Sequence, residues 1–232
     1  MRRLGKTHGV GAQRVDALVS IDLDLLPGEL VAITGRSGSG KTTLLNMAGA
    51  LDEPTTGEVI VDGQNLATLS KKELARVRRV SVGYVFQQFN LLPSLTAAEN
   101  ISLPLELDGM KPALARELAE KSLDEVELGG MADRYPDQLS GGEQQRVAIA
   151  RGLVGPRSVL LADEPTGALD EATSESILKL IRSRCDAGAA ALLVTHEPAY
   201  AAWADRVVRL RDGRVEGISV RSKTPSTTAD LA

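Results

Sequence analysis

The sequence predicts an α/β protein built on a mainly parallel sheet with helices on both faces. Short apolar runs typical of buried strands alternate with segments whose apolar residues have helical spacing. Residues 35–42 read GRSGSGKT and fit the phosphate-loop pattern G-x-x-x-x-G-K-[ST] at every fixed position. The apolar run 30–34 before them and the helix-like run 43–49 after them provide the strand–loop–helix setting that this loop needs.

The first part of the chain predicts small β elements around that unit. Residues 4–29 predict short strands and turns, with a half-buried strand from Leu18 or Val19 onward. Residues 58–64 predict a strand that ends in an Asp-Gly turn. The capping box that opens at Ser70 predicts a short helix reaching about Arg78.

The middle of the chain predicts mostly helix. Residues 81–86 predict a strand, and the proline-punctuated stretch 91–107 predicts a loop and a short helix. A second capping box at Ser140 predicts a helix through Val154. The segment 111–126 predicts a helix with an apolar stripe of Leu114, Leu118, Leu123 and Val126.

The last part returns to alternating strands and helices. Strands are predicted at 159–162 and 190–195, with a helix at 171–187 between them whose buried stripe is Ile177, Leu178, Ile181 and Cys185. A hairpin around Asp212-Gly213 joins 207–210 to 214–218. The Ser- and Thr-rich residues 219–232 predict a disordered tail.

Composition limits the possible partners and compartment. Net charge is −4, from 27 basic and 31 acidic residues, so there is no electrostatic footprint for nucleic acid and none is expected as a partner. The single cysteine, Cys185, cannot form an internal disulfide and suits a reducing compartment. The apolar run 187–194 is too short to span a bilayer, and the start lacks the apolar core of a secretory signal. A cytoplasmic protein is expected, with any membrane role arising through a partner.

The phosphate loop predicts a site for a nucleoside triphosphate. Gly35, Gly38 and Gly40 let the backbone curl and aim N–H groups at a phosphate. Lys41 can reach the β- and γ-phosphates, and the Thr42 hydroxyl can bind Mg²⁺. A glycine-rich connection with a chance lysine would leave the strand and helix around it unexplained.

Polar residues follow other predicted strands and should converge on the same sheet edge. Asp163 can hold Mg²⁺, and Glu164 can polarise the attacking water. His196 can contact a γ-phosphate or that water, and Gln87 can ligate the metal. Each taken alone has an ordinary alternative: a helix cap or turn for the acid pair, and a surface position for His196 or Gln87. The upstream phosphate loop favours the catalytic interpretation.

Residues 139–144, LSGGEQ, form a second glycine-flanked helix start. Such a terminus attracts anions. The capping box already explains Ser140 and Glu143, so an ordinary capped helix is the alternative. A cap does not require two glycines, however, and Gly141 and Gly142 suggest that something bulky approaches closely.

The order of these motifs resembles the nucleotide-binding subunit of an ATP-binding cassette (ABC) transporter over residues 8–218. LSGGEQ is highly specific to that superfamily, and LLADEPTG at 160–167 agrees with it. Residues 85–93 and 98–100 resemble the branch with lipoprotein-releasing, macrolide-exporting and cell-division ATPases. The resemblance implies one domain over 1–218: a phosphate-loop NTPase core, an antiparallel β subdomain and a helical signature subdomain at about 88–157.

The resemblance also implies partners and contacts. Two copies would bind head to tail, with each ATP between one phosphate loop and the other copy's 140–142. Residues 87–104 would form the groove for an integral membrane permease, placing the protein on the inner face of the cell membrane. Glu164, His196, Lys41 and Gln87 would be catalytic, and Thr42, Gln87 and Asp163 would hold Mg²⁺. The implied nucleotide contacts are His8, Val15, Gly35, Arg36, Ser37, Gly38, Ser39, Gly40, Lys41, Thr42, Thr43, Ser140, Gly141, Gly142, Gln144 and Asp170.

The start of the chain departs from the family pattern. His8 stands where the family usually has an aromatic residue, often tyrosine, that stacks on adenine, and a histidine stacks more weakly. The strand that usually precedes this position is expected to be nearly absent, since only residues 1–7 remain for it. Lys41, Asp163, Glu164 and His196 are all present, so active hydrolysis is expected.

These observations favour an ATPase subunit that drives a permease, of the export type. The alternative is a nucleotide-dependent switch that signals through a membrane partner to an extracytoplasmic enzyme without transport. A soluble cassette ATPase of DNA repair or translation is disfavoured, because the chain has no long coiled-coil insertion and no second cassette. LSGGEQ argues against a phosphate-loop kinase.

Overall fold

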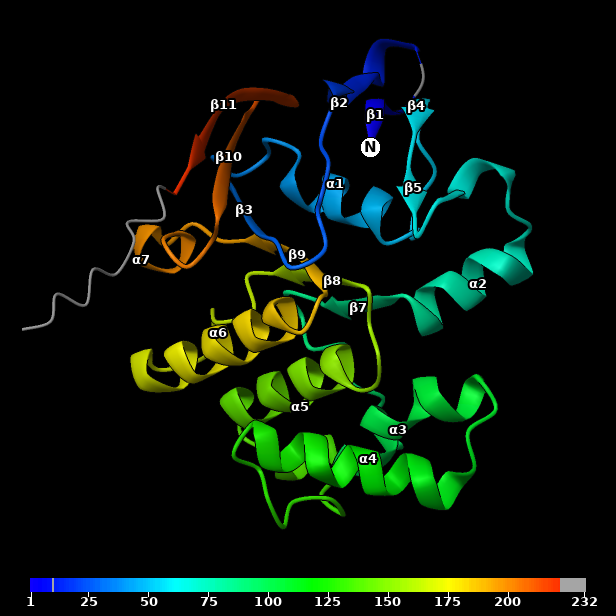
Figure 1. The fold of residues 1–232 in the computed structure, drawn as a ribbon, viewed down its shortest axis with the longest axis vertical. Coiled ribbons are helices and arrows are strands. Elements are labelled where there is room, and N and C mark those ends of the chain that lie inside the picture. Colours follow the sequence, from blue (N-terminus) through cyan, green and yellow to red (C-terminus); the bar gives the residue numbers. More distant parts are fainter. Residues whose placement is uncertain (10, 222–232) are drawn as a thin grey trace, which may run out of the picture.

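The computed structural model describes residues 1–9 and 11–221, and its centre is a six-stranded sheet (Figure 1). The sheet order is β11-β10-β3-β9-β8-β7. All neighbouring pairs are parallel except β10 and β11, which form a hairpin. The strands span Leu30–Thr34 (β3), Val82–Val85 (β7), Val159–Asp163 (β8), Ala190–Val194 (β9), Arg206–Arg211 (β10) and Arg214–Val220 (β11). The predicted mainly parallel α/β fold is therefore confirmed.

Each face of the sheet carries its own hydrophobic core, because successive side chains of a strand point to opposite faces. In β3, Val31 and Ile33 belong to the core shared with the small β sheets and α1 (Lys41–Ala48). Leu30 and Ala32 belong to the other core, which lies between the sheet and the large helices (Figure 1). Those helices are α3 (Ala97–Leu107), α4 (Pro112–Glu125), α5 (Gly141–Leu153) and α6 (Glu171–Asp186).

A separate antiparallel sheet of order β2-β1-β4 contains the first strand of the chain. The expectation that this strand would be nearly absent is wrong. β1 spans Arg2–His8 and pairs with both β2 (Val15–Ile21) and β4 (Thr56–Glu58). Pairing on both edges and full burial of Leu4 hold it in place. Of its two partners, β2 follows β1 after a short connection, and β4 is distant in sequence.

The predicted single strand over 58–64 is also wrong. The structure divides it between the end of β4 and a two-stranded hairpin of β5 (Ile60–Val61) and β6 (Gln64–Asn65). The Asp-Gly turn lies where it was expected, with φ of 49° at Asp62 and 75° at Gly63. Positive φ at both central residues is the conformation that hairpin turns need, and Asp212-Gly213 repeats it with φ of 48° and 72°.

Two predicted capping boxes are present. In α2 (Lys71–Val80) the Glu73 amide donates to Ser70 Oγ at 3.3 Å, and the Ser70 amide donates to a Glu73 carboxylate oxygen at 2.8 Å. In α5 the Glu143 amide donates to Ser140 Oγ at 3.3 Å. The Ser140 amide donates back to Glu143 at 2.7 Å. Both helices begin directly after the predicted cap.

The α3–α4 region differs from the expectation in length and in face. α3 is an eleven-residue helix that accommodates Pro104, rather than a short one. In α4 the predicted apolar stripe is partly wrong, because Leu114 is 49% exposed. Ala115 and Ala119 are buried in its place. These small side chains let α4 pack closely against α3 and α5.

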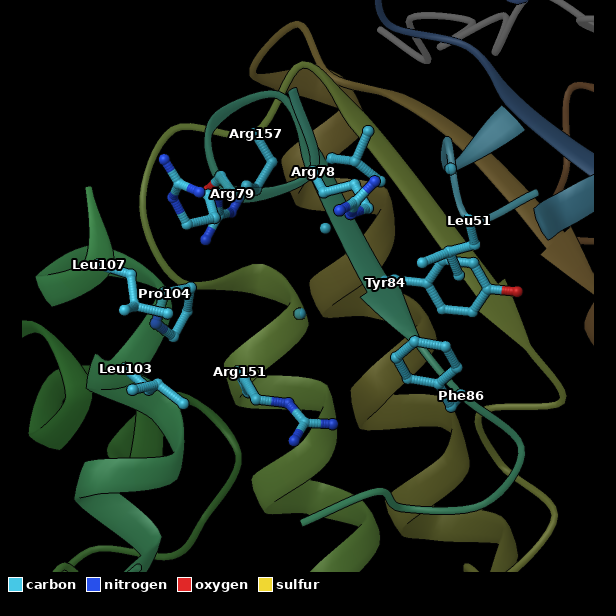
Figure 2. A pocket seen from close by; sticks show the side chains of 14 residues that line it. Leu51, Arg78, Arg79, Tyr84, Phe86, Leu103, Pro104, Leu107, Arg151 and Arg157 are labelled. Carbon is cyan, nitrogen blue, oxygen red and sulfur yellow. The ribbon is translucent and has the colours of Figure 1, made fainter. Parts of the chain in front are cut away.

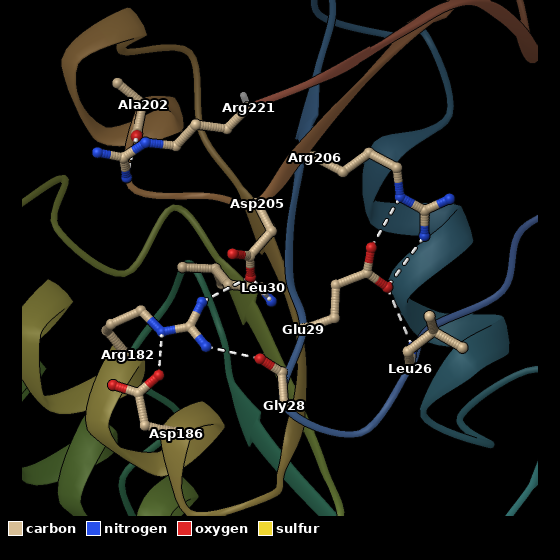
Figure 3. Close-up of polar contacts among 10 residues, drawn as sticks. All are labelled: Leu26, Gly28, Glu29, Leu30, Arg182, Asp186, Ala202, Asp205, Arg206 and Arg221. Carbon is tan, nitrogen blue, oxygen red and sulfur yellow. Dashed lines mark hydrogen bonds and ion pairs between the residues drawn. The ribbon is translucent and has the colours of Figure 1, made fainter. Parts of the chain in front are cut away.

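An ion-pair cluster closes the end of the sheet where β3 and β10 begin (Figure 3). Arg182 of α6 donates to Asp205 Oδ2 at 2.7 Å and to the Gly28 carbonyl at 2.6 Å. Asp205 also accepts from the Leu30 amide at 2.9 Å. Beside it, Arg206 pairs with Glu29 at 2.9 Å between Nε and Oε1. The start of β3 is thereby tied to α6 and β10.

The remaining short helices are η1 (Gly11–Gln13), η2 (Leu66–Thr68), η3 (Pro136–Gln138) and α7 (Pro198–Ala201). Within residues 1–9 and 11–221, the helices include none with the length and apolar character of a bilayer span. β11 reaches Val220, two residues into the predicted tail, and residues 222–232 of that tail lie outside the described part of the chain.

Candidate nucleotide site

The glycine loop joins β3 to α1 in a shape that only glycine permits. A Cβ on Gly35, whose φ is 152°, would lie 2.3 Å from the Leu210 carbonyl oxygen. A Cβ on Gly40, whose φ is 101°, would lie 2.5 Å from the Ala17 carbonyl oxygen. The loop is therefore packed against β10 and β2, and α1 begins directly after it with Lys41.

Lys41 bends back over the loop. Its Nζ donates to the carbonyl oxygens of Gly35 at 2.9 Å and Arg36 at 3.0 Å. Ser39 places its Oγ in the same loop, buried and with no hydrogen-bond partner among the described residues. The Lys41 ammonium group thus lies against the loop backbone at the N-terminus of α1. A positive charge at a helix N-terminus is suited to binding a phosphate group.

Thr42 and Asp163 meet across the sheet edge. Thr42 Oγ1 donates to Asp163 Oδ2 at 2.8 Å, which joins the start of α1 to the end of β8. Asp163 is only 4% exposed, and burial raises the pKa of its carboxyl group, while the Thr42 bond lowers it and nearby Glu164 raises it. A hydroxyl and a buried carboxylate at this distance form a pair of hard oxygen donors.

The Glu164 side chain contacts His196 and Gln87, the other two residues predicted for this edge of the sheet. Its carboxylate lies 3.3 Å from His196 Nδ1 through Oε1 and accepts from Gln87 Nε2 at 3.4 Å through Oε2. Its backbone has a φ of 47°, and its amide donates to the Val194 carbonyl at 3.0 Å. The ends of β7, β8 and β9 thus bring Gln87, Glu164 and His196 together, beside Asp163.

The LSGGEQ segment leads into α5. The side chains of Ser140, Glu143 and Gln144 make their hydrogen bonds with neighbouring residues of the same segment and of the turn before it. A Cβ on Gly141 would meet no atom within 4 Å, so this position faces open space. Gln144 Nε2 donates to the carbonyls of Pro136 at 2.9 Å and Leu139 at 3.0 Å. Among the described residues, no hydrogen bond joins 140–144 to the phosphate loop of the same chain. The two anion-attracting elements are thus separate features of one copy.

Asp170, His8 and Val15 occupy three further places. Asp170 caps α6, accepting from the Thr173 amide at 2.9 Å and the Thr173 hydroxyl at 2.8 Å. His8 and Val15 are exposed register partners at the end of the β1–β2 pair. Because β2 contacts the phosphate loop at Ala17, this pair lies at the edge of the nucleotide site.

Sequence reasoning missed residues that position the site. Gln145 is buried and donates to the Pro165 carbonyl at 2.9 Å, which fixes the chain just after Glu164. Its signal was available, since it is an amide on the same helical face as Ile149. Tyr84 donates to Asn46 Oδ1 at 2.9 Å and so ties β7 to α1, a contact that no local pattern indicates.

Comparison with known proteins agrees with this geometry. The ABC transporter family model matches residues 18–167. The ABC transporter ATP-binding protein YknY of Bacillus subtilis is 47% identical over 213 residues, covering 90% of this chain and 91% of YknY. The macrolide export ATP-binding/permease protein MacB of Brucella melitensis is 45% identical over 210 residues, covering 90% of this chain but 32% of MacB.

A solved structure matches the whole fold. It is a dimer of the ATP-binding cassette MJ0796 in a post-hydrolysis state, bound to ADP and Pi. The TM-score is 0.90 at 42% identity, over 94% of this chain and 97% of that one. The phosphate loop, the signature segment and these matches together show that the chain belongs to the ABC transporter family, as an ATP-binding cassette with ATPase activity.

Proposed function

We propose that this chain dimerises head to tail around two ATP molecules and uses their hydrolysis to drive an export-type membrane permease from the cytoplasmic side. One observation carries the proposal. Glu164 lies within 3.4 Å of both His196 and Gln87, at the same sheet edge as the Thr42–Asp163 pair. This is the set of groups that in-line attack on a γ-phosphate requires.

The phosphate loop and α1 hold the triphosphate. Backbone N–H groups of 35–43 and the Lys41 ammonium face the β- and γ-phosphates, while Lys41 exchanges its carbonyl partners for phosphate oxygens. His8 and Val15 contribute a partly aromatic surface for adenine at the end of β1–β2. Arg36, Ser37 and Thr43 contact phosphate or ribose through the same loop.

The residues present fit a magnesium ion. Thr42 Oγ1 and Asp163 Oδ2 are only 2.8 Å apart, and Mg²⁺ prefers hydroxyl, carboxylate and phosphate oxygens. Gln87 offers an amide oxygen at the same edge. A bound Mg²⁺ neutralises charge that develops on the phosphates.

Hydrolysis rests on Glu164. Its carboxylate orients a water for attack on the γ-phosphorus and accepts the water's proton as the bond to the leaving ADP breaks. His196 Nδ1, 3.3 Å from Glu164 Oε1, orients that carboxylate and can donate to the γ-phosphate as the two groups rearrange.

The second copy completes each site. The open space at Gly141 and the capped start of α5 leave room for a γ-phosphate held by the other copy, with Ser140 and Gly142 beside it. Gln144 acts indirectly, by holding the loop before α5, and Asp170 links the two sites across the interface. The dimeric state of the MJ0796 cassette supports this arrangement.

The Glu164→Gln variant tests the assignment of the base. The amide keeps the shape of the side chain but cannot take a proton, so turnover should be lost while ATP still binds. Gel filtration of this variant with ATP and Mg²⁺ should show a dimer, and the same variant without ATP should run as a monomer. Full hydrolysis in this variant would show that the base lies elsewhere.

The permease is tested by affinity purification of the tagged chain from membranes, with identification of the proteins that follow it. MacB of Brucella melitensis is an ATP-binding/permease protein, and the segment that matches this chain is 32% of it. A multi-span permease with a large extracytoplasmic domain is expected. If that permease carries no cargo but activates an extracytoplasmic enzyme, the signalling alternative replaces transport. Recovery of only soluble partners would contradict both.

A further inference from the structure

Gln145 is a buried amide on the helix that begins at the signature segment. It lies about one turn after Gly141 in α5, and it is 1% exposed. Its Nε2 donates to the Pro165 carbonyl at 2.9 Å, a contact between α5 and the chain that follows β8. A buried amide is costly unless it is hydrogen-bonded, so this bond offsets the cost of placing a polar side chain inside the protein.

The bond from Gln145 restrains the chain at Glu164, whose backbone φ is 47°. A residue other than glycine adopts this left-handed conformation at a cost, and keeps it only where its surroundings hold it. The Glu164 amide donates to the Val194 carbonyl at 3.0 Å, and the Glu164 carbonyl accepts from the Gly167 amide at 3.2 Å. The next carbonyl, that of Pro165, is held from α5. The direction of the Glu164 side chain therefore depends on where α5 lies.

The same helix also contacts the chain that follows Gln87. Arg151 extends from a later turn of α5 into a groove that Phe86 also lines (Figure 2). It donates to the carbonyls of Phe89 at 2.8 Å and Asn90 at 2.6 Å. α5 thus holds the chain just beyond the ends of both β7 and β8, the two strands that precede Gln87 and Glu164.

We propose that Gln145 is a positioning residue for hydrolysis, through which the placement of Glu164 depends on the signature segment of its own copy. In the head-to-tail dimer, the start of α5 contacts the ATP of one site, while Glu164 of the same copy acts in the other site. A shift of α5 on contact with that ATP passes through Gln145 to Pro165 and moves the base of the second site. The inference rests on the proposed function and adds a link between the two sites within each copy.

A purely structural role for Gln145 predicts a different result. A side chain that only fills the core would affect binding and hydrolysis together, whereas a positioning residue affects the chemical step at the base that it holds. Methionine is similar in length, adapts to the space around it and has no donor. Gln145→Met therefore removes the bond to Pro165 with little change in packing.

The first test separates hydrolysis from ATP binding. Gln145→Met should lower kcat by up to about a hundredfold, the scale of a shift of about 1 Å at a reacting group, with ATP affinity within about twofold of the wild type. Gln145→Asn keeps an amide but is too short for the bond, so it should show the same loss of kcat. Arg182→Ala changes the cluster at the opposite end of the sheet and should keep kcat. An unchanged kcat in both Gln145 variants, or an equal loss of kcat and ATP affinity, would overturn the inference.

Mixed dimers show which site depends on Gln145. When one copy carries Ser140→Arg and the other Glu164→Gln, one complete site remains, with its base from the first copy and its signature segment from the second. Gln145→Met in the copy that supplies the base should lower hydrolysis about tenfold or more. In the other copy it should leave most of the hydrolysis, because the capping box and Gln144 hold the signature segment independently. Equal losses from the two placements would overturn the inference.

The link to the signature segment is measured by the rate per complete site. In the mixed dimer, Ser140→Arg keeps the signature segment of the base-supplying copy from its ATP, so its site should be about fivefold or more slower than a site of the wild-type dimer. With Gln145→Met in both kinds of dimer, this difference should disappear. Equal rates per site with Gln145 intact would overturn the link while leaving the proposed function standing. No hydrolysis in the mixture before Gln145 is changed would instead contradict the proposed function.

Discussion

At the scale of single residues, the site contains a buried carboxyl group that lowers the stability of the protein without ligand. Asp163 is almost fully buried, and burial raises the pKa of its carboxyl group above the ordinary value. The charged form is therefore disfavoured in the native state relative to the unfolded chain. Under the proposed function, this carboxylate next to Thr42 would serve as a ligand of Mg²⁺, a role that a neutral side chain would fill less well.

The Asp163→Asn variant should accordingly be more stable than the wild type at neutral pH and inactive in hydrolysis. The stabilisation should shrink as pH falls through the native pKa of Asp163, because the wild-type carboxylate becomes protonated there. Thermal unfolding at several pH values measures it. Asp52→Asn is the matched control and should lower the stability at neutral pH. Burial raises the pKa of Asp52, but the hydrogen bonds from Lys6 and the Glu53 amide, together with nearby positive charge, lower it overall. A loss of stability in Asp163→Asn at neutral pH would contradict the account.

Ser140 caps α5 at the start of the signature segment. Ser140→Arg should stop hydrolysis by blocking the γ-phosphate of the other copy, while ATP still binds to the phosphate loop of the variant itself. The change also removes a helix cap, which costs about 1 kcal/mol. Ser70→Arg removes the equivalent cap from α2, with the same 3.3 Å bond, and should keep hydrolysis. Equal activity in the two variants would mean that the signature segment is only a cap.

At the scale of elements, sequence patterns correctly predicted the features that depend only on residues close together in the chain. The strand–loop–helix unit around Lys41, both capping boxes and the turn at Asp212-Gly213 lie where the sequence placed them. The failures come from packing between elements. β1 is held between β2, the next strand of the chain, and β4, which is distant in sequence. α4 buries Ala115 in place of Leu114 because close packing favours small side chains.

The site shows the same division. Thr42, Asp163 and Glu164 follow from motif and strand ends, because parallel strands end at one edge of the sheet. The contacts from Gln145 and Tyr84 connect separate elements, and no spacing within one segment encodes them. Sequence could thus indicate which residues meet, but not the helices and rings that hold them in place.

The cluster around Arg182 is predicted to stabilise the base of the sheet. Its side chain is 21% exposed and bonds to Asp186, Asp205 and the Gly28 carbonyl. Arg182→Ala should lower the free energy of unfolding by about 1–3 kcal/mol, the range for losing partly buried charged hydrogen bonds. Arg116 makes ion pairs of similar length on α4 but is 45% exposed, so Arg116→Ala should lower it by only about 0–1 kcal/mol. Urea unfolding compares the two, and equal losses would show that burial does not decide the strength of this cluster.

At the scale of the whole molecule, the phosphate loop and the signature segment of one copy do not bond to each other, and each is suited to one side of a phosphate. Two copies must therefore share each ATP if both elements are to contact it. In such a dimer, hydrolysis at one site needs Glu164 from the copy that holds the nucleotide and Ser140 from its partner.

Mixing two inactive variants tests this claim most directly. Glu164→Gln supplies an intact signature segment without the base, and Ser140→Arg supplies an intact base without the signature segment. Neither should hydrolyse ATP alone, with wild-type protein at the same concentration as the reference. If the sites are shared, mixed dimers contain one complete site and hydrolysis reappears in the mixture. A mixture as inactive as its parts would contradict the shared site, and with it the head-to-tail dimer.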